Sequence, residues 1–294
     1  MQCTIRGRNY ELIPDTAKST AHRDAYFALA KSVFGLDFTI WYDSGYSTDG
    51  FMPYTLFDGD RAVASVGVAI TDLNWRGKPV HAAQLSTIMT ANDYRGLGLS
   101  AWLMKHVLDE WKGKADLIYL HANDSVLDFY PKFGFIRAQE YVYRLPIHNN
   151  DADYRKLDLD NEQDAALLMD LYGRCNNPYS ALQLVGAPPT FHLVTNHPDN
   201  VYYVEKYNAV IVAEVERNEL WCYDIYTDSH SPMADILGAV ADDMTTVRLG
   251  FTPIDDGDCS CEKLLGKHTA SFAIDGDYNI FRLDKVTFPL LSQA

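Results

Sequence analysis

The segment from Gln84 to Ala101 constrains the fold of this chain more than any other stretch. A strand pattern over Val80–Thr90 runs into a polar, glycine-containing loop, Ala91–Gly98, and then into a helical pattern over Leu99–Trp111. Glycines allow backbone N–H groups to approach a ligand closely, and a helix start adds unpaired N–H donors at the positive end of the helix dipole. The segment therefore predicts a binding site for a phosphate or pyrophosphate.

Two kinds of phosphate-binding loop share the letters of this segment. Residues Gly96–Ala101 match the dinucleotide fingerprint G-x-G-x-x-G/A, but that loop begins at the end of its strand. Here the five residues Ala91–Arg95 intervene, and the next strand pattern ends in His-Ala-Asn at 121–123 instead of an acidic residue that would hold a ribose. A dinucleotide site is therefore disfavoured.

The second interpretation is Arg-x-x-Gly-x-small over Arg95–Ser100, which resembles the acyl-CoA pyrophosphate loop Gln/Arg-x-x-Gly-x-Gly/Ala of the GNAT acetyltransferase superfamily. Ser100 departs from the last motif position but is still small. Residues 123–135 resemble the second motif of that superfamily: an Asn, a short helix over Ser125–Lys132, an aromatic-Tyr pair and Gly-Phe opening a strand. Both motifs occur in the family order, and the resemblance covers roughly residues 10–145.

The resemblance implies an α+β (mixed α/β) fold, the GNAT fold, with a central mixed, mostly antiparallel sheet flanked by helices. A chain of 294 residues suits two domains. The polar segment His148–Asp164 is the candidate linker. We predict a catalytic, acyl-CoA-binding GNAT domain at residues 1–147 and a degenerate GNAT-like domain, without either motif, at residues 148–294.

Local patterns predict where several elements begin and end. A helix is expected over Thr20–Phe34, closed by Gly35, and a last strand of the first domain over Phe135–Leu145. In the second half we expect helices over Glu162–Arg174 and Pro232–Met244.

The resemblance also implies the roles of individual residues. The loop backbone would bind the pyrophosphate, and the end of the preceding strand would align the pantetheine arm of CoA. The residues implied to bind the cofactor are Ile88, Met89, Arg95, Gly96, Leu97, Gly98, Leu99, Ser100 and Asn123. Tyr130 falls at the general-acid position of the family, where a phenol of pKa about 10 can donate to a departing thiolate. The alternatives are a core tyrosine and, for Asn123, a helix N-cap.

The general base is not specified by the sequence. Relatives often place a Glu on the fourth or fifth strand, whereas the strand before the loop offers His81, Gln84 and Ser86, and His121 ends the next one. The ordinary pKa of a histidine suits a base, although an isolated histidine is more often structural. The apolar tail Phe288–Ala294 could also reach the acceptor site.

The charge is divided unevenly along the chain. The 25 Lys+Arg and 40 Asp+Glu residues give a net charge of −15. Residues 1–147 contain 15 Lys+Arg and 16 Asp+Glu, a net charge of −1. Residues 148–294 contain the other 10 Lys+Arg and 24 Asp+Glu, a net charge of −14. This sign disfavours nucleic acid and anionic membranes as partners. We expect the acidic second half to line the acceptor cleft and to attract a cationic amine.

The sequence gives little support for a metal cofactor or for a location outside the cytoplasm. The five cysteines form no Cys-x-x-Cys pair, and the three Asp-Gly-Asp tripeptides are typical of turns, so no metal is expected. No long apolar run is present, and a cytoplasmic protein is expected.

These observations predict a transferase that moves an acyl group, most simply acetyl from acetyl-CoA, directly to a primary amine of a small molecule. The alternatives are a non-catalytic acyl-CoA-binding regulatory module and an acetyltransferase acting on protein N-termini or lysines. A homodimer is left open.

Overall fold

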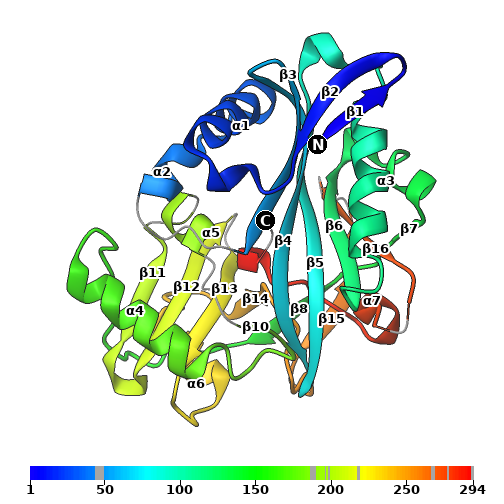
Figure 1. Ribbon diagram of the computed structural model, residues 1–294. Coiled ribbons are helices and arrows are strands. Elements are labelled where there is room, and N and C mark those ends of the chain that lie inside the picture. The colour runs from blue at the N-terminus through cyan, green and yellow to red at the C-terminus, as the bar shows by residue number, and fades with distance from the viewer. Residues whose placement is uncertain are drawn as a thin grey trace.

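The computed structural model describes residues 1–43, 50–185, 190–195, 197, 199–216, 219–265, 269–276 and 278–292. Over these residues the chain forms two mixed sheets flanked by helices, in agreement with the predicted fold class (Figure 1). The first sheet has nine strands in the order β1-β2-β3-β4-β5-β6-β16-β7, with β10 paired to β4. The second has seven in the order β15-β8-β14-β13-β12-β11-β9.

The strands of the first sheet are β1 (Gln2–Ile5), β2 (Arg8–Ile13), β3 (Phe51–Asp58), β4 (Arg61–Trp75), β5 (Lys78–Thr90), β6 (Leu117–Asn123), β7 (Phe135–Arg137), β10 (Leu182–Val185) and β16 (Thr269–Ile274). Those of the second are β8 (Tyr141–Pro146), β9 (Arg155–Lys156), β11 (Val201–Val204), β12 (Ala209–Glu216), β13 (Glu219–Thr227), β14 (Thr246–Leu249) and β15 (Ser260–Lys263).

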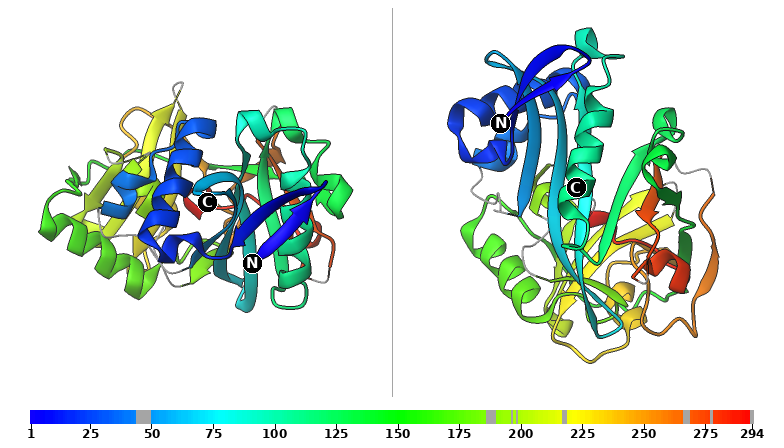
Figure 2. Two further views of the ribbon diagram at one scale, coloured as in Figure 1. Left: turned by 45° about the horizontal axis from the view of Figure 1, so that its top comes forward. Right: turned by 45° about the vertical axis from the view of Figure 1, so that its right-hand side comes forward.

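The helices are α1 (Thr20–Phe34), α2 (Phe38–Asp43), α3 (Leu99–Trp111), α4 (Glu162–Cys175), α5 (Thr190–Thr195), α6 (Met233–Gly238) and α7 (Ile280–Leu283). Short 3-10 turns are η1 (Thr16–Lys18), η2 (Asn92–Tyr94), η3 (Asp124–Val126), η4 (Tyr130–Phe133), η5 (Glu205–Tyr207) and η6 (Leu290–Ser292). In the views of Figures 1 and 2, α1 and α3 lie on different sides of the long strands β4 and β5.

The helices α1 and α3 begin and end where the sequence predicts. Their apolar residues recur at helical spacing, and Leu99, Leu103 and Val107 of α3 are buried in the core of the first sheet. Gly35 ends α1 in the left-handed conformation, φ 73°, and its N–H donates to the carbonyl of Lys31. Residues close together in the sequence therefore determine where these two helices begin and end.

The strands β5 and β6 separate part of the way along the sheet. They pair in parallel only between residues 82–85 and 117–120. Beyond this point β5 carries a bulge against β4, where the register shifts between Ser65 and Gly67 and Thr87 takes φ 43°. The bulge turns the end of β5 away from β6, so the two strands diverge before the glycine loop.

Three predictions about local structure are wrong. The short helix expected over Ser125–Lys132 is replaced by the two 3-10 turns η3 and η4. The strand expected over Phe135–Leu145 is two strands, β7 in the first sheet and β8 in the second. The helix expected over Pro232–Met244 stops at Gly238, where an added Cβ would lie 2.4 Å from the carbonyl oxygen of His148. Gly238 thus packs against the backbone of His148 with no room for a side chain.

The two sheets exchange strands across residue 147. Strand β8, from the first half, pairs with β14 and β15, whereas β16, from the second half, lies between β6 and β7. The division into residues 1–147 and 148–294 stays a prediction about domains, but each sheet contains a strand from the other half. Neither half completes its own sheet.

Candidate active site

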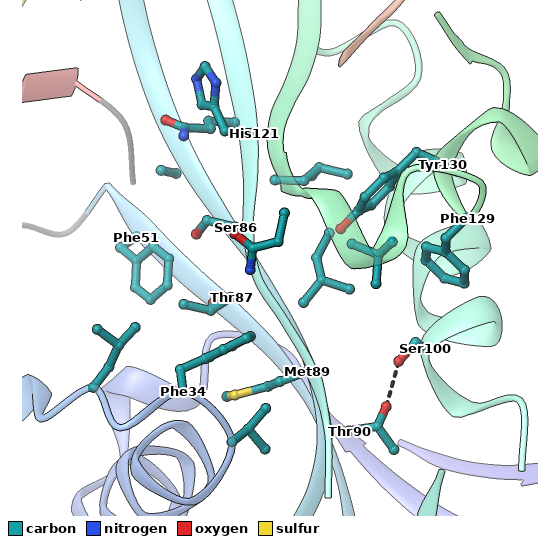
Figure 3. Close-up of a pocket in the computed structure, with 18 of the residues that line it drawn as sticks. Phe34, Phe51, Ser86, Thr87, Met89, Thr90, Ser100, His121, Phe129 and Tyr130 are labelled. Atoms are coloured by element: carbon teal, nitrogen blue, oxygen red, sulfur yellow. Dashed lines mark hydrogen bonds between the residues drawn. The ribbon is translucent and has the colours of Figure 1, made fainter. Parts of the chain in front are cut away.

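A cavity of 1440 Å³ lies where β5 and β6 separate. Figure 3 shows Ser100, Phe129 and Tyr130 on one side of the long strands, with Phe34 and Phe51 on the other. The cavity thus has two ends. The loop end is lined by Arg6, Arg95, Gly96, Gly98, Ser100 and Lys132. The aromatic end is lined by Phe34, Phe38, Trp41, Phe51 and Phe191.

The loop end is built around the start of α3. Gly98 is the N-cap of this helix, with φ 81°, and has no side chain that could satisfy the N–H groups of the first turn. The hydroxyl groups of Ser100 and Thr90 are 2.5 Å apart, so the serine that departs from the family motif is accommodated by a threonine of β5 (Figure 3). The helix start is therefore open to an anion.

Three cationic side chains add positive charge at the loop end: Arg6, Arg95 and Lys132 all line the cavity. Arg6 comes from the turn between β1 and β2, where it has φ 49°, and its Nη1 donates to the carbonyl oxygen of Gly96 over 3.0 Å. An added Cβ on Gly98 would lie 3.2 Å from Nε of Arg6. The N-terminal hairpin thus reaches the glycine loop, a contact that no sequence motif indicates.

The bulged end of β5 forms the wall between the two ends. Ile88 and Met89 both line the cavity, and Met89 also packs in the core beneath α1. Asn123, at the end of β6, lines it from the opposite strand. The cavity thus lies between the separated ends of β5 and β6.

Tyr130 begins the turn η4 and lines the cavity with its side chain 5% exposed. Its ring packs against Phe129, Phe135 and Phe272 with centroid distances of 5.3, 6.2 and 5.6 Å. Burial raises the pKa of Tyr130 to about 12, because the apolar surroundings disfavour the phenolate. The phenol therefore stays protonated across the neutral range.

A hydrogen-bonded chain of three side chains ends at the cavity. His121 lines the cavity, and its Nδ1 lies 2.8 Å from the hydroxyl of Ser271 on β16, which donates to Oε1 of Glu140. An ionised carboxylate can only accept, and a hydroxyl has one hydrogen; Nδ1 of His121 is therefore the donor to Ser271. Its Nε2 then carries the lone pair, and this nitrogen is buried in the cavity wall.

The aromatic end joins the two halves of the chain. Phe191 of α5 packs against Phe38 and Trp41 of α2 with centroid distances of 5.6 and 5.8 Å. Other lining residues from the second half are Leu184, Val185, His192, Leu291 and Ser292. The expectation of an acidic lining from the second half is therefore wrong for the residues that the structure describes, since none of these side chains is Asp or Glu.

The cavity brings together Tyr130 and eight of the nine predicted cofactor residues. The exception is Leu97, which packs against the core of the first sheet. Of the histidines considered as a base, His121 lines the cavity, whereas His81 is not among its lining residues and is 2.6 Å from Asp72. Arg6, Lys132 and Phe191 were missed because no local pattern links them to the loop.

Within the described part of the chain, no group of three or more His, Cys, Asp or Glu side chains is arranged to hold a metal ion. In the same residues, no helix combines the length and the apolar character needed to cross a membrane.

Sequence comparisons connect the first half to known proteins. Residues 18–138 match the family model described as "Acetyltransferase (GNAT) domain". N-alpha-acetyltransferase 50 of Danio rerio is 49% identical over 58 residues, which is 17% of this chain and 34% of that protein. The chain thus matches about a third of the length of this relative.

Structural comparisons extend the similarity to the second half. A conserved protein of Enterococcus faecalis V583 has a TM-score of 0.58 at 14% identity, covering 89% of this chain and 72% of that one. Eis1 from Mycobacterium abscessus has a TM-score of 0.55 at 15% identity, covering 90% and 74%. A GCN5-related N-acetyltransferase from Kribbella flavida has a TM-score of 0.54 at 18% identity, covering 90% of this chain and 70% of that one. Both sheets therefore occur together in other proteins.

Proposed function

We propose that the protein transfers an acyl group, most simply acetyl, from acyl-CoA directly to a primary amine, as a member of the GNAT acetyltransferase superfamily, whose domain model matches residues 18–138. The observation that carries the proposal is that a single cavity is lined by both motif regions: the open helix start at Gly98 and the buried phenol of Tyr130. The gap between β5 and β6 lies between them.

The loop end fits acyl-CoA on chemical grounds. The first-turn N–H groups of α3 would hold the pyrophosphate, and Arg6, Arg95 and Lys132 would balance the charge of the phosphates. The edge of β5 at Ile88 and Met89 would align the pantetheine arm. Once bound, acyl-CoA supplies an activated thioester carbonyl next to the gap.

The reaction forms a nitrogen–carbon bond and breaks the carbon–sulfur bond, so one proton leaves the amine and one is needed at sulfur. We assign the first to Nε2 of His121, which is buried in the cavity wall and must turn toward the amine to receive the proton, and the second to the hydroxyl of Tyr130. A thiol has an ordinary pKa near 8.5, well below the value of about 12 for Tyr130. The hydroxyl of Tyr130 therefore stabilises the developing thiolate by donating a hydrogen bond to the sulfur before the proton itself is transferred.

Ser271 and Glu140 act as positioning residues for His121. They hold its tautomer, and the charge of Glu140 stabilises the imidazolium formed when the amine is deprotonated. Replacement of Glu140 by Gln should lower kcat about tenfold and move the acid limb of the kcat/KM pH profile to lower pH. If Glu140 were only structural, its replacement would not shift the pH profile of kcat/KM.

The test is thiol release from acetyl-CoA in the presence of a panel of amines. Tyr130→Phe should lower kcat about a hundredfold while changing the Kd for acetyl-CoA less than twofold. Tyr10→Phe is the matched control: Tyr10 is buried in the same core, does not line the cavity, and its hydroxyl has no hydrogen-bond partner within the described structure.

Binding of acetyl-CoA without thiol release on any amine or protein would contradict catalysis and favour the regulatory module. Intact-mass measurement of candidate proteins incubated with acetyl-CoA separates a protein acceptor from a small molecule.

A further inference from the structure

We propose that the acceptor is a primary amine that carries an aromatic or similarly apolar group, which the aromatic end of the cavity binds. The proposal rests on the acyl transfer proposed above and names the class of its second substrate. It comes from the walls of the cavity on the side of β5 away from Tyr130 (Figure 3).

The first observation is a group of exposed apolar side chains at this end. Phe34 is 41% exposed, Leu36 38% and Val185 55%, and all three line the cavity. Water-exposed apolar side chains gathered around one concave surface mark ligand-binding grooves, because leaving them uncovered has a cost in free energy. A ligand with apolar surface would cover them.

The second observation is the arrangement of aromatic rings. Phe38 and Trp41 from the first half meet Phe191 from the second, and Phe51 completes the wall from β3. Aromatic pairs at centroid distances of 4.5–7 Å gain energy beyond the area that they bury. Phe38 is buried, but Trp41, Phe51 and Phe191 are only partly buried, so a ring on the ligand would contact these three.

The third observation is the charge of the lining. Asp72 is the one carboxylate among the described lining residues, and it is exposed and paired with His81 at 2.6 Å. A polyamine would have to bring a second ammonium group into this apolar space without a carboxylate dedicated to it, which is costly. The walls therefore favour an amine with one charge and a ring.

The experiment compares three acceptors with acetyl-CoA and the full chain: 2-phenylethylamine, spermidine and a peptide with an N-terminal Phe. We expect kcat/KM for 2-phenylethylamine or for the peptide to exceed that for spermidine at least tenfold. The faster of these two shows whether the ring belongs to a free amine or to a protein N-terminus.

Equal or faster acetylation of spermidine would overturn this inference and leave the proposed acyl transfer intact. Failure of every amine and protein to release thiol would instead overturn the proposed function.

Variants at the rim make the test specific. Phe34→Ala should lower kcat/KM for 2-phenylethylamine about tenfold and leave the Kd for acetyl-CoA unchanged. Tyr278→Ala is the control, because Tyr278 is 45% exposed but does not line the cavity. Equal effects of the two variants would contradict an aromatic acceptor pocket.

Discussion

The two sheets contain the same local arrangement, but only one of them opens. In the first sheet, β5, α3 and β6 form a strand, a helix and a parallel strand; in the second, β13, α6 and β14 do the same, with residues 220–222 paired in parallel to 247–249. Even the bulge recurs, since the register of β12 and β13 shifts between Val212 and Ala213. This recurrence agrees with the prediction of a degenerate GNAT-like second domain, although its sheet also contains β8 from before residue 148.

The two sheets differ just beyond the parallel pair of strands. In the second sheet the N–H of Gly250 still donates to the carbonyl of Cys222 over 2.7 Å, so β13 and β14 stay together where β5 and β6 diverge. The nearby space lined by Asp224, Phe251 and Leu291 is a cavity of 10 Å³, about the volume of one water probe. The helix α6 has 6 residues against 13 in α3. Topology and bulge are therefore not sufficient; the divergence of the strands and the open helix start make the site.

The largest expected effect comes from the loop of the first sheet. Gly98→Asp would place a carboxylate at the helix start and would strain a residue at φ 81°, so the affinity for acetyl-CoA should fall roughly a thousandfold, about 4 kcal/mol. Calorimetric titration measures this. Gly113→Asp is the control, because Gly113 has φ 79° and open space around it. An unchanged Kd in the Gly98 variant would show that the loop does not bind the cofactor.

A substitution where β13 and β14 stay together should change the stability of the protein and not its affinity for acetyl-CoA. An added Cβ on Gly250 would lie 2.9 Å from Cα of Tyr223, so Gly250→Ala should lower the free energy of unfolding by about 2 kcal/mol. Denaturant unfolding checks the loss, and acetyl-CoA affinity should not change. Gly173→Ala, inside α4 with no atom near the new Cβ, should not destabilise. Weaker acetyl-CoA binding by the Gly250 variant would show that the second sheet also contributes to the cofactor site.

Asp224 should give the second sheet a pH dependence of its own. Desolvation raises its pKa from 3.8 to about 6, while Asn177 donates to its Oδ1 over 2.6 Å. Because the folded state binds the proton more tightly, this contribution is complete below about pH 4 and is lost as the pH rises through 6. In the wild type we expect the free energy of unfolding to fall by about 1–2 kcal/mol between pH 4 and 8, and Asp224→Asn should remove this decrease. The decrease is smaller than the full pKa shift implies because the side chain retains some solvent contact. Parallel pH profiles of wild type and variant would contradict this.

The smallest effect is expected at the N-terminal hairpin. Arg6→Ala should weaken acetyl-CoA binding about fivefold, about 1 kcal/mol, because one exposed charge near the phosphates is lost. Arg8→Ala, in the same hairpin but away from the cavity, is the control. A loss that persists at high salt would contradict an electrostatic role.

How far the sequence predicts this molecule depends on the distance between interacting residues. Periodicity and a glycine cap predict α1 and α3 because the determining residues are neighbours in the chain. The contacts of Arg6 with Gly96 and of His121 with Ser271 span 90 and 150 residues, and no local pattern encodes them. The insertion of β16 into the first sheet is hidden for the same reason. Leu97 was included with its motif, although its side chain packs against the core.

The stoichiometry of acetyl-CoA binding shows whether the first sheet alone holds acyl-CoA. Calorimetric titration of the full chain should give one molecule per chain, with binding abolished by Gly98→Asp and retained in Gly250→Ala. Two molecules per chain, or one that survives Gly98→Asp, would contradict the account.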